Sequence, residues 1–305
     1  MDHFNKLLVG IDFTESDASI IQYTEFICKL SKPEKIYFIH VHNNFDLPEE
    51  IKKELSLEEP YDEYLQDEMQ QLVTANFSSH ADFDIEYLIV EGAPFPQMLH
   101  WVKIKDIDLA ILGKKNSVGS GVFLTRFTRR TSSSVLIVPE NSETDLDSIL
   151  VCNDFSINSE LSIQKAIDFS KLLPSSTIYS QHIFTVPVGY HKTGKSFEEF
   201  ASIMKKHALS KYREFEQGLN VPKGIYITPI FTLNKKSDPA TLVQKTADSM
   251  QAKMVIVGSK GRTFAASIFL GSFAECLVRE QTNVPLLVIK RKDESLSVLD
   301  AIKKL

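Results

Sequence analysis

The sequence predicts an α/β protein of two tandem domains, each built on a mostly parallel five-stranded sheet with helices on both faces. Apolar runs of strand length alternate along the chain with segments of helical apolar spacing. The two halves of the chain repeat the same order of elements. The length of 305 residues suits two domains of roughly 150 residues each. Such an arrangement is doubly wound and Rossmann-like, and it places ligands beyond the carboxyl ends of the strands.

The internal repeat is clearest at the start of each half. Residues 6–13 are K-L-L-V-G-I-D-F, and residues 148–155 are S-I-L-V-C-N-D-F. In the same register, the apolar run at 36–41 matches the run at 178–183, and both contain a histidine, His40 or His182. Because two runs, an aspartate and a histidine recur in one register, the chain is a tandem duplication.

Each repeat is expected to open with a strand that leads to an aspartate, Asp12 or Asp154, and then to a helix. Further helices alternate with the remaining strands, which is typical of a parallel sheet covered on both faces. The later strands are expected at residues 36–41, 85–90 and 135–138 in the first repeat, and at 178–183, 225–231, 254–257 and 286–289 in the second.

The domain boundaries follow from this pattern. Residues 139–147 form a polar stretch opened by proline, which is typical of a linker. We therefore expect a first domain over residues 1–143 and a second over residues 144–291. Residues 292–305 carry apolar side chains at helical spacing and are expected to form a C-terminal helical tail.

Composition excludes several classes of function. The net charge of −6 argues against nucleic acid as a partner, because neutralising phosphates needs a basic face. The N-terminus lacks the features of a signal peptide and no apolar run reaches membrane-span length, so we expect a cytoplasmic protein without membrane contact. Cys28, Cys152 and Cys276 are scattered and predict neither disulfides nor a zinc site.

One stretch, residues 257–272, carries the functional signal. It follows the apolar run at 254–257 and has the spacing Gly-x2-Gly-x9-Gly-Ser, formed by Gly258, Gly261, Gly271 and Ser272. Ser272 is expected to cap a helix that begins at Phe273. A strand, a glycine loop and a helix start together present backbone N–H groups to an anion. Three glycines near a strand end are also compatible with a simple turn.

The spacing is neither the P-loop pattern nor the dinucleotide fingerprint. It resembles the ATP-binding signature of the universal stress protein family, and the resemblance spans both halves, most strongly at residues 149–155 and 254–289. It implies a tandem, UspA-like member with two adenine nucleotide alpha hydrolase-like domains. It further implies an adenosine site in the second domain, with Asp154, Ile183, Gly258, Gly261, Gly271 and Ser272 as the binding residues.

Each implied role is physically reasonable. Asp154 can accept hydrogen bonds from ribose or help to hold Mg²⁺, although an aspartate here is equally suited to capping the next helix. Ile183 ends a strand and can wall the adenine. Lys260 and Arg262 either pair with phosphates or point to solvent.

The first repeat departs from the signature. It keeps Asp12 and Val41, but Asn116 and Arg126 stand where the second and third glycines are expected. We therefore predict no ATP there, and its basic loop either holds another anion or forms a solvated or interdomain face. His40 and His42 alone are too few for a metal site, and we expect no side chains that act as metal ligands. We also expect no catalytic residues.

The leading hypothesis is a stress-response protein that binds ATP or a related adenine nucleotide, with Mg²⁺, in its C-terminal domain and acts as a nucleotide-dependent switch or interaction module. The alternatives are a slow ATPase or phosphoryl-transfer enzyme, and a nucleotide-free stress interaction protein. The resemblance also implies an intramolecular pseudo-dimer through residues 136–138 and 287–289, and a homodimer is compatible with it. No protein partner is identifiable.

Overall fold

The computed structural model describes residues 4–55, 59–115, 120–261, 270–280 and 283–291. Predictions for Asn116, for Arg262 and for the tail at 292–305 lie outside these residues. The chain divides into two compact units whose main segments are Met1–Thr144 and Asp145–Lys290. We call them unit 1 and unit 2.

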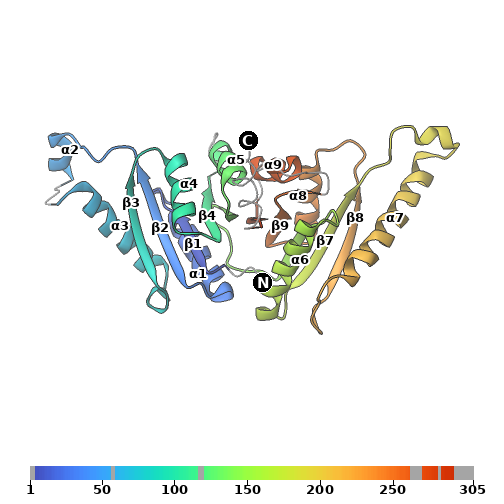
Figure 1. Ribbon diagram of the computed structural model, residues 1–305, viewed down its shortest axis with the longest axis horizontal. Coiled ribbons are helices and arrows are strands. Elements are labelled where there is room, and N and C mark those ends of the chain that lie inside the picture. The colour runs from blue at the N-terminus through green and yellow to red at the C-terminus, as the bar shows by residue number, and fades with distance from the viewer. Residues whose placement is uncertain (1–3, 56–58, 116–119, 262–269, 281–282, 292–305) are drawn as a thin grey trace, which may run out of the picture. The chain divides into compact units, whose positions relative to one another are not determined.

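Unit 1 contains a five-stranded sheet in the order β3-β2-β1-β4-β5, and every pairing between these neighbours is parallel. Helices connect successive strands (Figure 1). Its elements are β1 (Lys6–Gly10), α1 (Asp17–Ser31), β2 (Lys35–His42), α2 (Glu49–Glu54), α3 (Tyr61–Asn76), the 3-10 helix η1 (His80–Asp82), β3 (Ile85–Glu91), α4 (Pro94–Ile104), β4 (Leu109–Lys114), α5 (Ser120–Arg130) and β5 (Ser134–Pro139).

Unit 2 repeats this plan with the strand order β8-β7-β6-β9-β10, again parallel throughout. Its long helix α7 lies beside β8 (Figure 1). Its elements are β6 (Ser148–Cys152), α6 (Ile157–Leu172), β7 (Thr177–Phe184), the 3-10 helix η2 (Tyr190–Thr193), α7 (Phe197–Gln217), β8 (Ile227–Leu233), α8 (Pro239–Ser249), β9 (Met254–Gly258), α9 (Ser272–Arg279) and β10 (Leu286–Ile289).

The order of the strands places helices on both faces of each sheet. In unit 2 the chain steps from β6 to β7 to β8 in one direction, then crosses back to β9 and β10. Because crossovers between parallel strands are right-handed, the two directions put their helices on opposite faces. Accordingly α6 and α7 cover one face, while α8 and α9 pack together on the other. The predicted α/β fold with doubly wound parallel sheets is confirmed.

Strands such as β9 form where the sequence has an unbroken apolar run, because both faces of a parallel sheet are buried. In β9 the side chains of Met254, Val255, Ile256 and Val257 are all at most 3% exposed. One predicted strand is displaced: the run at 225–231 becomes β8 at Ile227–Leu233. Gly224, at φ 94°, makes a turn that the Ile225 N–H closes on Pro222, and the strand therefore starts later.

The switch point of unit 2 lies between β6 and β9, where the direction of the crossovers reverses. The register pairs Val151 with Ile256, and Cys152 with Gln181. The carboxyl ends of β6, β7 and β9 therefore meet at one edge, which is where a doubly wound sheet binds its ligand. In the described part of the chain no helix has both the length and the apolar character that crossing a bilayer requires.

Candidate functional site

Unit 2 has a cavity of about 300 Å³ at the carboxyl ends of β6, β7 and β9. This volume is at the lower end of the range for small-molecule sites. Five of the six predicted site residues line it: Asp154, Ile183, Gly258, Gly261 and Gly271. The walls are completed by side chains from β7, α8, α9 and the residue after β8, including Gln181, His182, Asn234, Val243 and Phe273.

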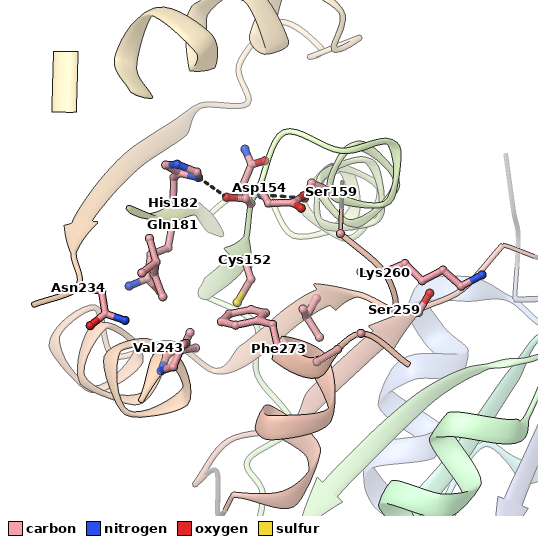
Figure 2. A pocket seen from close by; sticks show the side chains of 18 of the residues that line it. Cys152, Asp154, Ser159, Gln181, His182, Asn234, Val243, Ser259, Lys260 and Phe273 are labelled. Carbon is pink, nitrogen blue, oxygen red and sulfur yellow. Dashed lines mark hydrogen bonds between the residues drawn. The ribbon is translucent and has the colours of Figure 1, made fainter. Parts of the chain in front are cut away.

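Asp154 is held in place by hydroxyl and amide donors at the start of α6. Its Oδ1 accepts from Ser159 Oγ at 2.8 Å and from the Ser156 N–H at 3.1 Å. Figure 2 shows Asp154 and Ser159 turned toward one another. The N-cap of α6 is Ser156, whose side chain accepts from the Ser159 N–H. The helix-cap alternative for Asp154 is therefore wrong.

Gly258 and Gly261 allow two close approaches. A Cβ on Gly258 would lie 2.7 Å from Cβ of Asn158, so glycine lets β9 pack tightly against the start of α6. A Cβ on Gly261 would lie 2.7 Å from Oδ2 of Asp154. The loop after β9 therefore passes directly beside the carboxylate.

Gly271 and Ser272 depart from their expected roles. The N-cap of α9 is Gly271, and Ser272 is the first helical residue, so the prediction that Ser272 caps this helix is wrong. The reason is the backbone: the Gly271 N–H donates to the Ser259 carbonyl at 2.7 Å, and its own carbonyl accepts from Glu275. Gly271 thus fastens the helix start to the loop. Ser272 is exposed and is not among the residues that line the cavity.

The start of α9 contributes backbone donors nonetheless. The first N–H groups of any helix have no partner within the helix. Phe273 and Ala274 in this first turn line the cavity, and a Cβ on the N-cap Gly271 would lie 3.6 Å from Cα of Lys260 in the loop. The positive end of the helix makes this region suited to an anion, whereas the side chain of Lys260 extends away from Asp154 and Phe273 (Figure 2).

The residues that sequence reasoning missed lie mainly at the opposite end of the cavity. Gln181, Asn234 and Val243 group together there, away from Ser259 and Lys260 (Figure 2). Gln181 precedes Ile183 by two positions on β7, so the two side chains share a face of the sheet. A glutamine within a strand that is buried in the sheet was the available signal. Asn234 and Val243 are brought in by the packing of β8 and α8, which no local pattern reveals.

Two residues that line this cavity each have a buried polar atom without a hydrogen-bond partner among the described residues. These atoms are Ser259 Oγ and Gln181 Oε1, on residues that are each 2% exposed. Unsatisfied buried polar atoms are rare and call for an explanation. Burial also raises the pKa of Cys152 to about 12, so its thiol stays protonated and is not a nucleophile.

Unit 1 has a corresponding cavity of about 380 Å³, lined by Asp12, Asp17, His40 and Lys115 among others. Here Lys115 Nζ lies 2.5 Å from the Asp12 carboxylate. Asp17 replaces Ser159 in register, and its Oδ2 accepts from the Asp12 N–H at 3.2 Å. Burial, with the nearby charge of Asp12, raises the pKa of Asp17 to about 6. The aspartate of unit 1 thus has a lysine and a second carboxyl group as neighbours.

The two repeated histidines have the same structural role. His40 Nδ1 contacts the Ile11 carbonyl at 2.9 Å, and His182 Nδ1 contacts the Asn153 carbonyl at 2.8 Å. Each ring also packs on a phenylalanine, Phe13 in unit 1 and Phe155 in unit 2. Both histidines therefore fix the chain after the first strand of their unit.

An adenine nucleotide with Mg²⁺ fits the donors and acceptors of unit 2. The space beside Asp154 is one that a Cβ on Gly261 would fill, and Asp154 supplies the only carboxylate among the described residues that line the cavity. One carboxylate with phosphate oxygens and water is a common way to hold Mg²⁺. Among the described residues, the one cluster of three metal-ligating types is Asp238, Cys276 and Glu280, and none of these lines the cavity.

Known proteins resemble part of this chain in sequence. Residues 146–290 match the model of the universal stress protein family. The chain is 27% identical to universal stress protein MJ0577 of Methanocaldococcus jannaschii over 159 residues, which are 48% of this chain and 95% of that protein.

Solved structures resemble the whole chain. A universal stress protein from Archaeoglobus fulgidus DSM 4304 matches with a TM-score of 0.64 and 18% identity, over 96% of this chain and 98% of that one. A putative universal stress protein from Pseudomonas aeruginosa UCBPP-PA14 matches with a TM-score of 0.63 and 13% identity, over 98% of both chains. At these identities the likeness establishes the fold.

Proposed function

We propose that the cavity of unit 2 binds ATP or a related adenine nucleotide together with Mg²⁺, because residues 146–290 match the universal stress protein family model and include the residues that line this cavity. The protein then acts in the stress response as a nucleotide-dependent switch or interaction module. The pairing of the two units through their last strands stays a prediction, as does a homodimer.

The observation that carries this proposal is the gathering of Asp154, Gly258, Gly261 and Gly271 around one cavity at the switch point of the sheet. These residues come from the turn after β6, from the loop after β9 and from the start of α9. A nucleotide would place its phosphates by Lys260 and the first turn of α9, where N–H groups and positive charge favour anions. Its ribose would lie by Asp154, and its base against β7 and α8.

Slow hydrolysis receives less support than binding. An ATPase needs a group that activates or positions the attacking water. Among the described residues that line the cavity, Asp154 is the only carboxylate, and its Oδ1 already accepts two hydrogen bonds. We therefore expect nucleotide turnover, where it occurs, to be slow.

Calorimetric titration of Mg-ATP into the full chain tests the proposal. The wild type should bind with a dissociation constant in the micromolar range. The Gly271→Arg variant should not bind, because its side chain would occupy the space beside Ser259 and Lys260, where a Cβ alone comes within 3.3 Å of the Ser259 carbonyl oxygen. Gly218→Arg is the matched control, since Gly218 lies after α7 and a Cβ there has only one neighbour, at 3.4 Å.

Mass spectrometry of the small molecules released by heating the purified protein identifies a copurifying nucleotide. Absence of binding in the wild type, with no copurifying adenine compound, would reject the proposal and favour the nucleotide-free interaction protein. Equal binding by the wild type and Gly271→Arg would place the nucleotide elsewhere.

A further inference from the structure

Gln181 is a polar side chain buried within the sheet of unit 2. It lies on β7, is 2% exposed, and lines the cavity of unit 2. Its neighbours in the cavity, Asn234 and Val243, lie at the end away from Lys260 (Figure 2). A nucleotide whose phosphates lie by Lys260 would therefore bring its base, the far end of the molecule, to Gln181.

Hydrogen bonds fix which way the Gln181 amide faces. Its Nε2 donates to Thr246 Oγ1 at 2.7 Å and to Thr232 Oγ1 at 3.0 Å, and it lies 3.4 Å from the Leu242 carbonyl oxygen. The Thr246 hydroxyl donates its own hydrogen to that same carbonyl, at 3.0 Å. Thr246 Oγ1 can therefore only accept from Gln181, and the carbonyl can only accept as well. A flipped amide would set its oxygen against two acceptors.

This arrangement leaves Gln181 Oε1 as a fixed acceptor. The atom is buried and has no hydrogen-bond partner among the described residues. A buried acceptor without a donor is unfavourable, so a ligand that brings an N–H group to it gains affinity. A ligand that brings a carbonyl oxygen to the same place meets repulsion between two acceptors.

We infer that Gln181 is a specificity-determining residue, which selects purines with a 6-amino group and rejects purines with a 6-oxo group. The inference rests on the proposed function, since it concerns the base of the nucleotide in the same cavity. A 6-amino group donates to Oε1, whereas the 6-oxo group of inosine or guanine cannot. Sites built to pair with one polar group discriminate strongly against analogues that lack it.

ATP and inosine triphosphate are suitable probes because they differ only in the base, where inosine has a 6-oxo group and an N1–H in place of the 6-amino group and the bare N1 of adenine. The wild type should bind Mg-ATP at least about 10-fold more tightly than Mg-ITP. Gln181→Met keeps the length of the side chain and removes the acceptor. It should weaken ATP binding by about 10-fold, leave ITP binding equal or stronger, and bring the two affinities within about 3-fold of each other.

Two further variants separate this role from a general effect on packing. Thr246→Val leaves Gln181 in place but removes the acceptor that orients its amide, so part of the discrimination should be lost. Gln244→Met carries the matched substitution on a residue that does not line the cavity and bonds Asp248 instead, so its ATP-to-ITP ratio should equal that of the wild type.

The outcomes distinguish the two ideas. Binding of ATP by Gln181→Met with the wild-type preference over ITP would overturn the role of Gln181 and leave nucleotide binding intact. Absence of binding of either nucleotide to the wild type would reject the proposed function, and the base selection with it. If Gln181→Met does not fold, an unchanged ratio in a folded Thr246→Val protein would overturn the inference.

Discussion

Replacing Gly261 with alanine perturbs the candidate site at a single point. The new Cβ would lie 2.7 Å from Oδ2 of Asp154, well inside the distance at which non-bonded atoms repel. The carboxylate is the end of a side chain and can retreat, but its Oδ1 is held by Ser159 and by the Ser156 N–H. The substitution therefore turns Asp154 away from the loop or breaks these hydrogen bonds.

The expected effect on binding follows from what the carboxylate offers a ligand. A hydrogen bond to a charged group contributes about 1.5–3 kcal/mol, and each 1.4 kcal/mol changes a dissociation constant about tenfold. Gly261→Ala should therefore weaken Mg-ATP binding by about 10- to 100-fold. Folding stability should change by less than about 1 kcal/mol, because only a partly exposed side chain has to move.

Calorimetry of Mg-ATP binding and urea unfolding measure these two effects separately. Gly218→Ala serves as the control, since its Cβ would meet only the Phe215 carbonyl oxygen at 3.4 Å, outside the cavity. Unchanged ATP affinity in a folded Gly261→Ala protein would refute the argument that this glycine keeps the carboxylate available to the nucleotide.

Three further substitutions test packing and electrostatics. Gly258→Ala should lower the free energy of unfolding by about 1–3 kcal/mol in urea titrations, because its Cβ would lie 2.7 Å from Cβ of Asn158. Burial and the Asp12 charge raise the pKa of Asp17 from 3.8 to about 6. The stability that Asp17 contributes is therefore present below pH 4 and is lost as the pH rises through 6, by up to about 3 kcal/mol. Asp17→Asn should flatten this part of the profile of unfolding free energy against pH. Burial raises the pKa of Glu25, but hydrogen bonds from two serines and a lysine outweigh this effect and lower the pKa from 4.5 to about 2. The stability that Glu25 contributes, up to about 3 kcal/mol, is therefore present above pH 4.5 and is lost toward pH 2. A Glu25→Gln protein whose unfolding free energy falls between pH 4.5 and 2 as steeply as that of the wild type would contradict this prediction.

The fold could be predicted from the sequence because parallel strands need apolar side chains on both faces, and such runs are visible without a structure. The run at Met254–Val257 became β9, extended by one residue to Gly258. The glycine spacing located the loop beside Asp154, since a close backbone approach needs a residue without a Cβ. These features depend on local composition and order alone.

Details that depend on backbone angles or on packing could not be predicted in the same way. The N-cap of α9 is Gly271 rather than Ser272. Its extended conformation, φ −63° and ψ 147°, is one that either residue can adopt, so the sequence does not indicate which of the two is the cap. The cavity wall at Gln181 depends on how α8 packs across the sheet, which brings Thr246 within 2.7 Å of the amide. Sequence patterns specify elements more readily than contacts between them.

The two units differ in the residues that surround the aspartate after their first strand. Both place an aspartate after the first strand, and in both the residue five positions later contacts its N–H: Asp17 in unit 1 and Ser159 in unit 2. Ser159 also donates to the carboxylate of Asp154, whereas Asp17 can offer Asp12 only a second acidic group. With Lys115 paired to Asp12, the acceptor in unit 1 is already engaged by the protein. In unit 2 the Ser159 hydroxyl and the Ser156 N–H both donate to the carboxylate of Asp154, whose negative charge would suit a ribose hydroxyl or a hydrated Mg²⁺.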